Sequence, residues 1–199
     1  VRIVSDLSLW NIGVAGEGKT LEEAFQRLSV ATERVRAFLL KKEFPLESVE
    51  LGPIRTSTFY VRDAKGNETR EVIGHELSRA FSIKSTDVEK VSKAAGEVTE
   101  LLQGGAQVVS QPPSFVYTKL ADLKIQMLGE ATANARQRAE LIAQESKCRI
   151  GAVKDARAGV LQITPPWSTE VSGGGMNDTS SIEKDVMSVV HLTVAIKSD

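Results

Sequence analysis

The chain has 199 residues and an almost even charge, with 25 lysines and arginines against 26 aspartates and glutamates. This balance argues against a nucleic-acid partner or a polybasic membrane surface, because both need clustered cations. A single cysteine cannot form an internal disulfide, and two histidines leave little for a metal centre. With 41% hydrophobic residues, the composition predicts a folded globular protein, and we expect neither a metal nor a cofactor.

No segment is predicted to cross a membrane as a helix. The most apolar run, residues 186–196, is 11 residues long and contains serine, histidine and threonine. A spanning helix needs ~20 mostly apolar residues. The run is therefore interpreted as a strand.

The spacing of apolar residues divides the chain into strands and helices. Alternation of apolar and polar residues predicts strands, whereas apolar residues at every third or fourth position predict helices. Pro45 marks the end of the first helix, and Pro112-Pro113 interrupts a strand. In chain order, the predicted elements are a strand over 3–14, a helix over 20–44, strands over 49–62 and 71–84, a helix over 87–103, a strand over 107–117, a helix over 118–146, and strands over 150–163 and 182–197.

The order of these elements, β-α-β-β-α-β-α-β-β, predicts an α+β fold. Hairpin connections imply mainly antiparallel sheets, with helices packed on one face. A strand–helix–hairpin pattern occurs within residues 1–86 and again within 107–199, and both halves end in a similar short sequence. We therefore expect one region over 1–199 that consists of two small units joined by a connecting helix over 87–106.

Two further features are expected to shape the second half. Alanines at every fourth position, from Ala131 to Ala143, form a small-residue stripe that lets a helix approach a sheet closely. The segment 164–181, with Pro165-Pro166 and three consecutive glycines, is longer than most loops in compact domains. It is predicted to be either mobile or functional, and it is a candidate contact element.

One segment fits a nucleotide-binding motif. The sequence from Gly13 to Gly18, followed by Lys19 and Thr20, matches G-x-x-x-x-G-K-[ST] between a predicted strand and a predicted helix. In a P-loop the backbone N–H groups cradle phosphates, the lysine reaches the outer phosphates and the threonine holds Mg²⁺. However, the preceding strand is half polar and the hairpin topology lacks β-α-β crossovers. We interpret the segment as a glycine-rich turn, and keep a P-loop-like nucleotide-binding enzyme as the alternative.

No complete catalytic or metal-binding set is evident. His75 and His191 lie 116 residues apart with no third partner, and Cys148 has neighbouring cations but no acid–base partner. We therefore predict no catalytic residues and no metal ligands. A carrier of a small apolar ligand, held between sheet and helices, stays open as a third interpretation.

Several stretches together resemble the SIMPL-domain family. His75 stands where the family usually has tyrosine, within a strand that otherwise fits. The matching stretches are Val72–Ser78 followed by Phe81–Lys84, Glu130–Ala143 (A-x-x-N-A-R-x-x-A-E-x-x-A), Ile150–Val153, Asp178–Val186 (D-x-S-S-I-x-K-x-V), and Gly16 with Leu21–Ala24.

This resemblance implies an α+β fold of two interlocked units and export by a signal peptide to the periplasm or outer membrane. That peptide is expected to precede Val1. The family is linked in general terms to stress tolerance and self-assembly, and it supplies no catalytic residues to transfer. We therefore predict a non-enzymatic cell-envelope protein that acts through self-assembly, as a homo-oligomer, or through binding another envelope protein.

Overall fold

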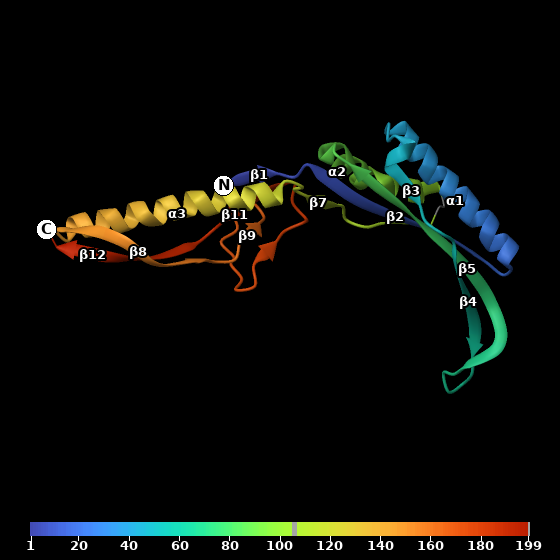
Figure 1. Ribbon diagram of the computed structural model, residues 1–199. Helices are drawn as coiled ribbons and strands as arrows, with labels where there is room; N and C mark the ends of the chain where they lie inside the picture. Colours follow the sequence, from blue (N-terminus) through green and yellow to red (C-terminus); the bar gives the residue numbers. More distant parts are fainter. Residues whose placement is uncertain (105–106, 199) are drawn as a thin grey trace. The chain divides into compact units, whose positions relative to one another are not determined.

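The computed structural model describes residues 1–104 and 107–198 (Figure 1). These residues form three α-helices and twelve strands in three mostly antiparallel sheets, with the helices packed on the sheets. The α+β prediction is confirmed. The chain divides into two compact units: the first unit is Asp6–Val116, and the second unit combines Val1–Ser5 with the chain from Tyr117 onward.

The first unit is built around a sheet in the order β3-β5-β2-β6, in which β4 also pairs with β5 and β7 with β2. Its strands are β2 (Leu7–Gly18), β3 (Val49–Leu51), β4 (Arg55–Arg62), β5 (Glu68–Ser85), β6 (Gln107–Ser110) and β7 (Ser114–Val116), and its helices are α1 (Leu21–Lys41), α2 (Val88–Glu97) and the 3-10 turns η1 (Leu46–Ser48) and η2 (Val98–Gly104).

The core of the first unit lies between one face of this sheet and the helices. Alternate residues of β2, including Trp10, Ile12 and Val14, point into it and are at most 2% exposed. The apolar stripe of α1 packs against them, as its spacing predicts. Val91 of α2 is also buried there.

The segment 87–106 was expected to connect two halves. Its described residues belong instead to the first unit. Its amphipathic helix buries its apolar stripe in the nearest core, and the boundary between units falls after Val116 instead.

The second unit contains two small sheets and one long helix. The first sheet has the order β1-β11-β9-β10 and the second is the pair β12-β8. The helix α3 lies against both β8 and β12 (Figure 1). Within residues 131–143 its alanine stripe is less exposed than the other side chains, and Ala143 is buried. The elements are β1 (Arg2–Val4), α3 (Leu120–Glu145), β8 (Cys148–Ala158), β9 (Gln162–Thr164), β10 (Met176–Asn177), β11 (Glu183–Met187) and β12 (Val190–Ser198).

Three of the long predicted strands are each divided between two different sheets. The predicted strand over 3–14 is divided between β1 and β2, which belong to different units. The strands over 150–163 and 182–197 are likewise divided into β8 and β9, and into β11 and β12. Apolar residues stand on both sides of each break, so the local pattern did not reveal the change of sheet. The predicted loop over 164–181 contains β10, which pairs in parallel with β9.

None of the helices in the described part of the chain combines the length and the apolar content that a membrane crossing needs.

Candidate functional site

The segment that matches the P-loop motif is not a loop. Gly13 to Gly18 form the second half of β2, and each residue is paired with β5, from Gly13 opposite Ala80 to Gly18 opposite His75. The first residues of the segment also pair with β6 on the other side. Backbone groups that pair with neighbouring strands cannot curl around a phosphate. The glycine-rich turn expected here is thus a continuation of β2, and the geometry favours a structural role for the segment over a phosphate-binding loop.

The glycines of this segment are packing positions. A Cβ atom on Gly16 would collide with the backbone of Ala24 and Leu28, and one on Gly18 would lie 2.5 Å from the Ala24 nitrogen. Helix α1 thus approaches β2 so closely that only hydrogen fits between them. Gly13, by contrast, faces away from α1. A Cβ atom placed on it would lie 3.7 Å from its nearest neighbour, the Val109 carbonyl oxygen, which is an ordinary contact.

Lys19 and Thr20 form the start of α1. The Thr20 hydroxyl accepts a hydrogen bond from the Glu23 N–H at 3.2 Å, and the Glu23 carboxylate accepts one from the Lys19 N–H at 2.9 Å. This pair of bonds closely resembles a capping box, which satisfies N–H groups that the first turn leaves unpaired. The threonine that would hold Mg²⁺ in a P-loop is therefore a helix cap here.

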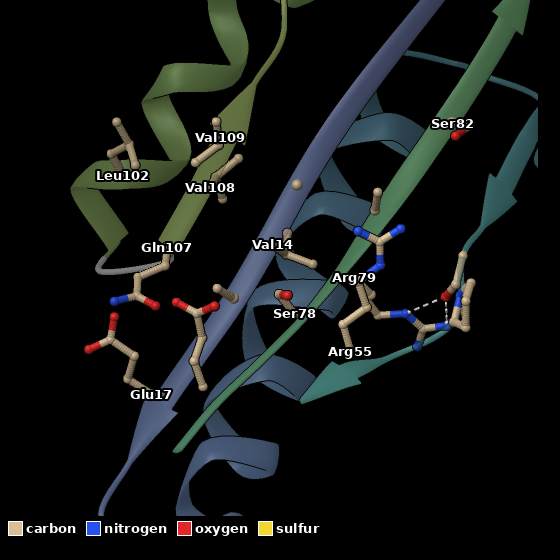
Figure 2. A pocket seen from close by; sticks show the side chains of 16 residues that line it. Val14, Glu17, Arg55, Ser78, Arg79, Ser82, Leu102, Gln107, Val108 and Val109 are labelled. Atoms are coloured by element: carbon tan, nitrogen blue, oxygen red, sulfur yellow. Dashed lines mark hydrogen bonds between the residues drawn. The ribbon is translucent and has the colours of Figure 1, made fainter. Parts of the chain in front are cut away.

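The other face of the same sheet carries a trough of about 770 Å³ (Figure 2). Helix α1 covers the core face of the sheet, whereas this face is lined by small side chains. Exposed Val109 and Leu102 form one wall, and the segment from Gly52 to Arg55 forms the other. The floor consists of Gly13, Ala15, Ser78, Ala80 and Ser82.

The two sides of the trough differ in charge. Glu17 lies beside Gln107 on one side, and Arg55 and Arg79 lie on the other (Figure 2). Arg79 donates two hydrogen bonds to the Gly52 carbonyl, at 2.8 and 3.2 Å, which fixes its guanidinium at the wall. The trough can therefore bind an elongated, partly apolar group. The sequence analysis missed it, because the small residues at alternate positions of β2 and β5 share one floor only once these two strands pair.

A buried ion pair lies in the second unit, at the start of β11. Lys184 has a side chain 2% exposed, and its ammonium group lies 3.4 Å from an oxygen of Asp178, whose side chain is 7% exposed. The ammonium group also donates to the Ser181 carbonyl. Asp178 accepts further bonds from the N–H and hydroxyl of Ser180. The pair ties the segment 178–184 into a compact turn.

The pKa values of both members of this pair lie below their ordinary values. Burial alone would raise the pKa of Asp178, but hydrogen bonds from Ser180 and Ser181 and the charge of Lys184 outweigh it and hold the pKa at about 2. Burial lowers the pKa of Lys184 below its usual value, and Asp178 opposes that shift. At neutral pH the carboxylate is therefore firmly ionised.

A second cluster joins three segments of the second unit. Arg2 donates two hydrogen bonds to the Asp185 carboxylate, at 2.9 and 3.1 Å, and its guanidinium lies 4.2 Å from the ring centre of Trp167. The backbone N–H of Trp167 also donates to the Asp185 carboxylate. The Arg2 hydrogen bond is the largest cause holding the pKa of Asp185 at about 2. This cluster fixes one end of the predicted contact loop.

Trp167 is exposed to solvent. Its side chain is 83% exposed, and its φ of +66° is a left-handed conformation that bulky residues rarely adopt. Such strain persists only where surrounding contacts impose it. An exposed tryptophan held against an arginine is the kind of surface that partners bind.

The two histidines and the cysteine do not come together. Half-buried His75 lies beside Thr58, with 3.1 Å between its ring nitrogen and the threonine hydroxyl, and His191 is exposed on β12. The Cys148 thiol donates to the Ser146 carbonyl. Among the described residues, no three histidine, cysteine or acidic side chains are grouped as metal ligands would be.

A family model described as SIMPL, a protein of unknown function (DUF541), matches residues 1–194. The chain belongs to the SIMPL family. The resemblance stated from the sequence motifs is thereby confirmed. No curated protein matches the chain.

The SIMPL motifs can now be placed in the fold. The stretch Asp178–Val186 contains the buried ion pair, and Glu130–Ala143 is the part of α3 that lies along β8 and β12. Gly16 and Leu21–Ala24 form the close contact between β2 and α1. The motifs that carry the resemblance thus include residues that hold the fold together.

Proposed function

We propose that this SIMPL protein is a non-enzymatic cell-envelope protein that works by association, through self-assembly or through binding another envelope protein. The observation that carries the proposal is a set of large apolar side chains exposed on thin parts of the fold. Phe59 and Ile73, on the hairpin of β4 and β5, are 46% and 58% exposed, and Ile125 and Ile142 of α3 are 74% and 68% exposed.

Neither thin part can bury these side chains by itself. The hairpin extends beyond β2, whose pairing with β5 stops at His75, so its outer part has two strands only. Two-stranded ribbons are marginal in water, and exposed apolar side chains gathered on them mark interaction surfaces. Association would cover them.

Envelope location is part of the same proposal and rests on the family resemblance. The coding sequence upstream of Val1 is expected to encode a signal peptide. Cell fractionation should then recover the protein from the periplasm or the outer membrane. Recovery from the cytoplasm of cells that express the natural gene would contradict this part of the proposal.

Sedimentation velocity over a hundredfold range of concentration tests association directly. We expect the purified chain to form a discrete oligomer, and deletion of residues 169–177 in the loop that follows Trp167 tests that contact element. Deletion of residues 64–66, at the tip of the β4–β5 hairpin, tests the other candidate surface in the same way. A monomer at every concentration would contradict self-assembly. Binding to another envelope protein would then be the part of the proposal that remains.

A further inference from the structure

The pair β8 and β12 is the thinnest part of the second unit. It has only two strands, covered on one face by α3, and none of its described residues is fully buried. Val153 of β8 is 55% exposed and Ile196 of β12 is 70% exposed. In the described part of the chain neither strand pairs with a third strand, so both present an outer edge. An outer edge is a row of unpaired backbone donors and acceptors that another strand can join.

The two edges differ in how well they are protected. Beside Lys154, the pairing moves from Thr193–Asp155 to Val194–Val153, so one extra residue of β8 has no partner. A second extra residue of β8 follows before Ile150. Such bulges twist an edge strand away from new partners. β8 also carries four charged residues, Arg149, Lys154, Asp155 and Arg157. Bulges and charges are the usual devices that block strand addition.

The β12 edge has neither device. From Val190 to Ile196 it contains no lysine, arginine, aspartate or glutamate, and the extra residues of both bulges lie on β8. Its side chains are mainly β-branched or aliphatic, which favours pairing in a sheet. The two edges of one ribbon are thus unequal, and only the edge of β12 is left open to another strand.

We propose that two copies of this chain pair through β12, antiparallel and centred on Thr193. This inference rests on the self-assembly form of the proposed function. In that register Thr193 faces its own copy, Leu192 faces Val194, and Val190 faces Ile196. Threonine pairs and aliphatic pairs directly opposite each other stabilise antiparallel strands, and no charged residues are set opposite each other.

The surroundings of β12 suit a second copy better than an unrelated strand. Antiparallel pairing across a two-fold axis places both α3 helices on the same face of a four-stranded sheet. On the β12 side of α3 lies a groove of about 510 Å³. Its lining consists of three alanines of the small-residue stripe, Asn134, Arg138 and Ile142 of α3, and the segment from Met187 to Leu192. Val189 and Ile142, 47% and 68% exposed, border it. The same two-fold axis brings the partner's groove alongside, so each helix helps to cover the apolar border of the other.

Cysteine cross-linking tests the inference, because the only natural cysteine can be removed. In a Cys148→Ser background, Thr193→Cys should form a disulfide-linked dimer under mild oxidation. Residues directly opposite in an antiparallel pair have Cα atoms ~4.5–5.5 Å apart, within reach of a disulfide. The matched control is Asp155→Cys, because Asp155 is the partner of Thr193 within the ribbon.

The two variants give opposite results for the two edges. In the β12 pair, Asp155 and its copy are separated by three strand spacings, roughly 14 Å, which no disulfide spans. A cross-link in Asp155→Cys but not in Thr193→Cys would overturn the inference in favour of β8. An oligomer by sedimentation with neither cross-link would overturn it while leaving self-assembly intact. A monomer by sedimentation in the Cys148→Ser background would count against both.

Mixing adds a check of the register. Leu192→Cys and Val194→Cys, combined in equal amounts, should give a cross-linked heterodimer more readily than either variant alone, because each faces the other in the proposed pair. An equal yield in the separate and mixed samples would contradict the Thr193 centre.

Discussion

The two units reach stability in different ways. In the described residues of the first unit, sixteen buried apolar side chains form one cluster between α1, α2 and the sheet, whereas the corresponding cluster of the second unit has five. The second unit relies more on polar ties. The buried pair of Lys184 and Asp178 and the partly exposed pair of Arg2 and Asp185 hold its segments together, and the Val186 N–H donates to the Val1 carbonyl.

This difference suggests a division of roles. A unit with a large core can fold without help, whereas one with a small core and a thin ribbon gains most from a partner. The first unit offers a preformed trough on a stable sheet, and the second offers a strand edge. The variants below test this contrast by weakening each unit separately.

Lys184→Ala should have the largest effect. Removing one member of a buried ion pair leaves the other charge uncompensated, and such changes cost about 3–5 kcal/mol. The second unit should therefore lose its protection against hydrogen exchange, while the peptides of α1 and β2 keep theirs.

Lys154→Ala is the control for this change, since Lys154 is an exposed lysine of the same unit. It should alter the free energy of unfolding by no more than about 0.5 kcal/mol. Equal loss of protection in both units would mean that they unfold together, and the contrast between them would be wrong.

Gly16→Ala adds a single methyl group, and it should lower the stability of the first unit more than the same change at other glycines of β2. Its Cβ would meet the backbone of α1, which cannot move aside as a side chain can. Overpacking of this kind costs roughly 1–3 kcal/mol. Gly13→Ala adds the same methyl three residues earlier, on the open face, and should be nearly neutral. Urea denaturation followed by the fluorescence of buried Trp10 measures both, and equal midpoints would refute the close contact.

Much of the fold could be predicted from the sequence, because the signals were local. The stripe of α1, the cap at Thr20 and the alanines of α3 each follow from the spacing of residues in one segment. The divided strands could not be predicted in this way. Nothing local to Ser5 or Asp6 shows that β1 pairs with β11, far along the chain, whereas β2 pairs with β5.

The candidate sites show the same contrast between local signals and long-range pairing. The P-loop match was local, and its polar strand pointed to the structural role that the pairing of β2 with β5 also favours. The trough needs β2 and β5 side by side before their small residues share one floor, and the cluster at Trp167 needs Arg2 and Asp185 from opposite ends of the chain. These features depend on long-range pairing, so spacing alone could not reveal them.

Acid should destabilise the second unit before the first, and this is the next largest expected effect. Asp178 and Asp185 both have a folded-state pKa of about 2, below the ordinary value of 3.8. Their ionised forms therefore stabilise the folded second unit above about pH 4, and this contribution is lost as the pH falls from about 4 through 2. Pepsin, which works in acid, should cut the second unit first over this range.

An Asp178→Asn variant checks the origin of this acid sensitivity. It lacks the titrating group, so it should be less stable at neutral pH and lose less additional stability between pH 4 and 2. Cleavage of the first unit ahead of the second would contradict the assignment of acid sensitivity to these carboxylates.

The smallest expected effect concerns Lys19. Its backbone N–H is held by Glu23, and the preceding glycines are paired in a sheet, so Lys19→Ala should leave stability within about 0.5 kcal/mol of the original. Calorimetry with Mg-ATP should give no binding heat for either protein. Binding that is present in the original chain and lost in Lys19→Ala would restore the nucleotide-binding alternative. It would also require β2 to separate from β5 near Gly18, which hydrogen exchange at those residues would detect as new exposure on adding Mg-ATP. The two measurements together therefore distinguish a rearranged phosphate loop from a strand whose glycines serve the approach of α1.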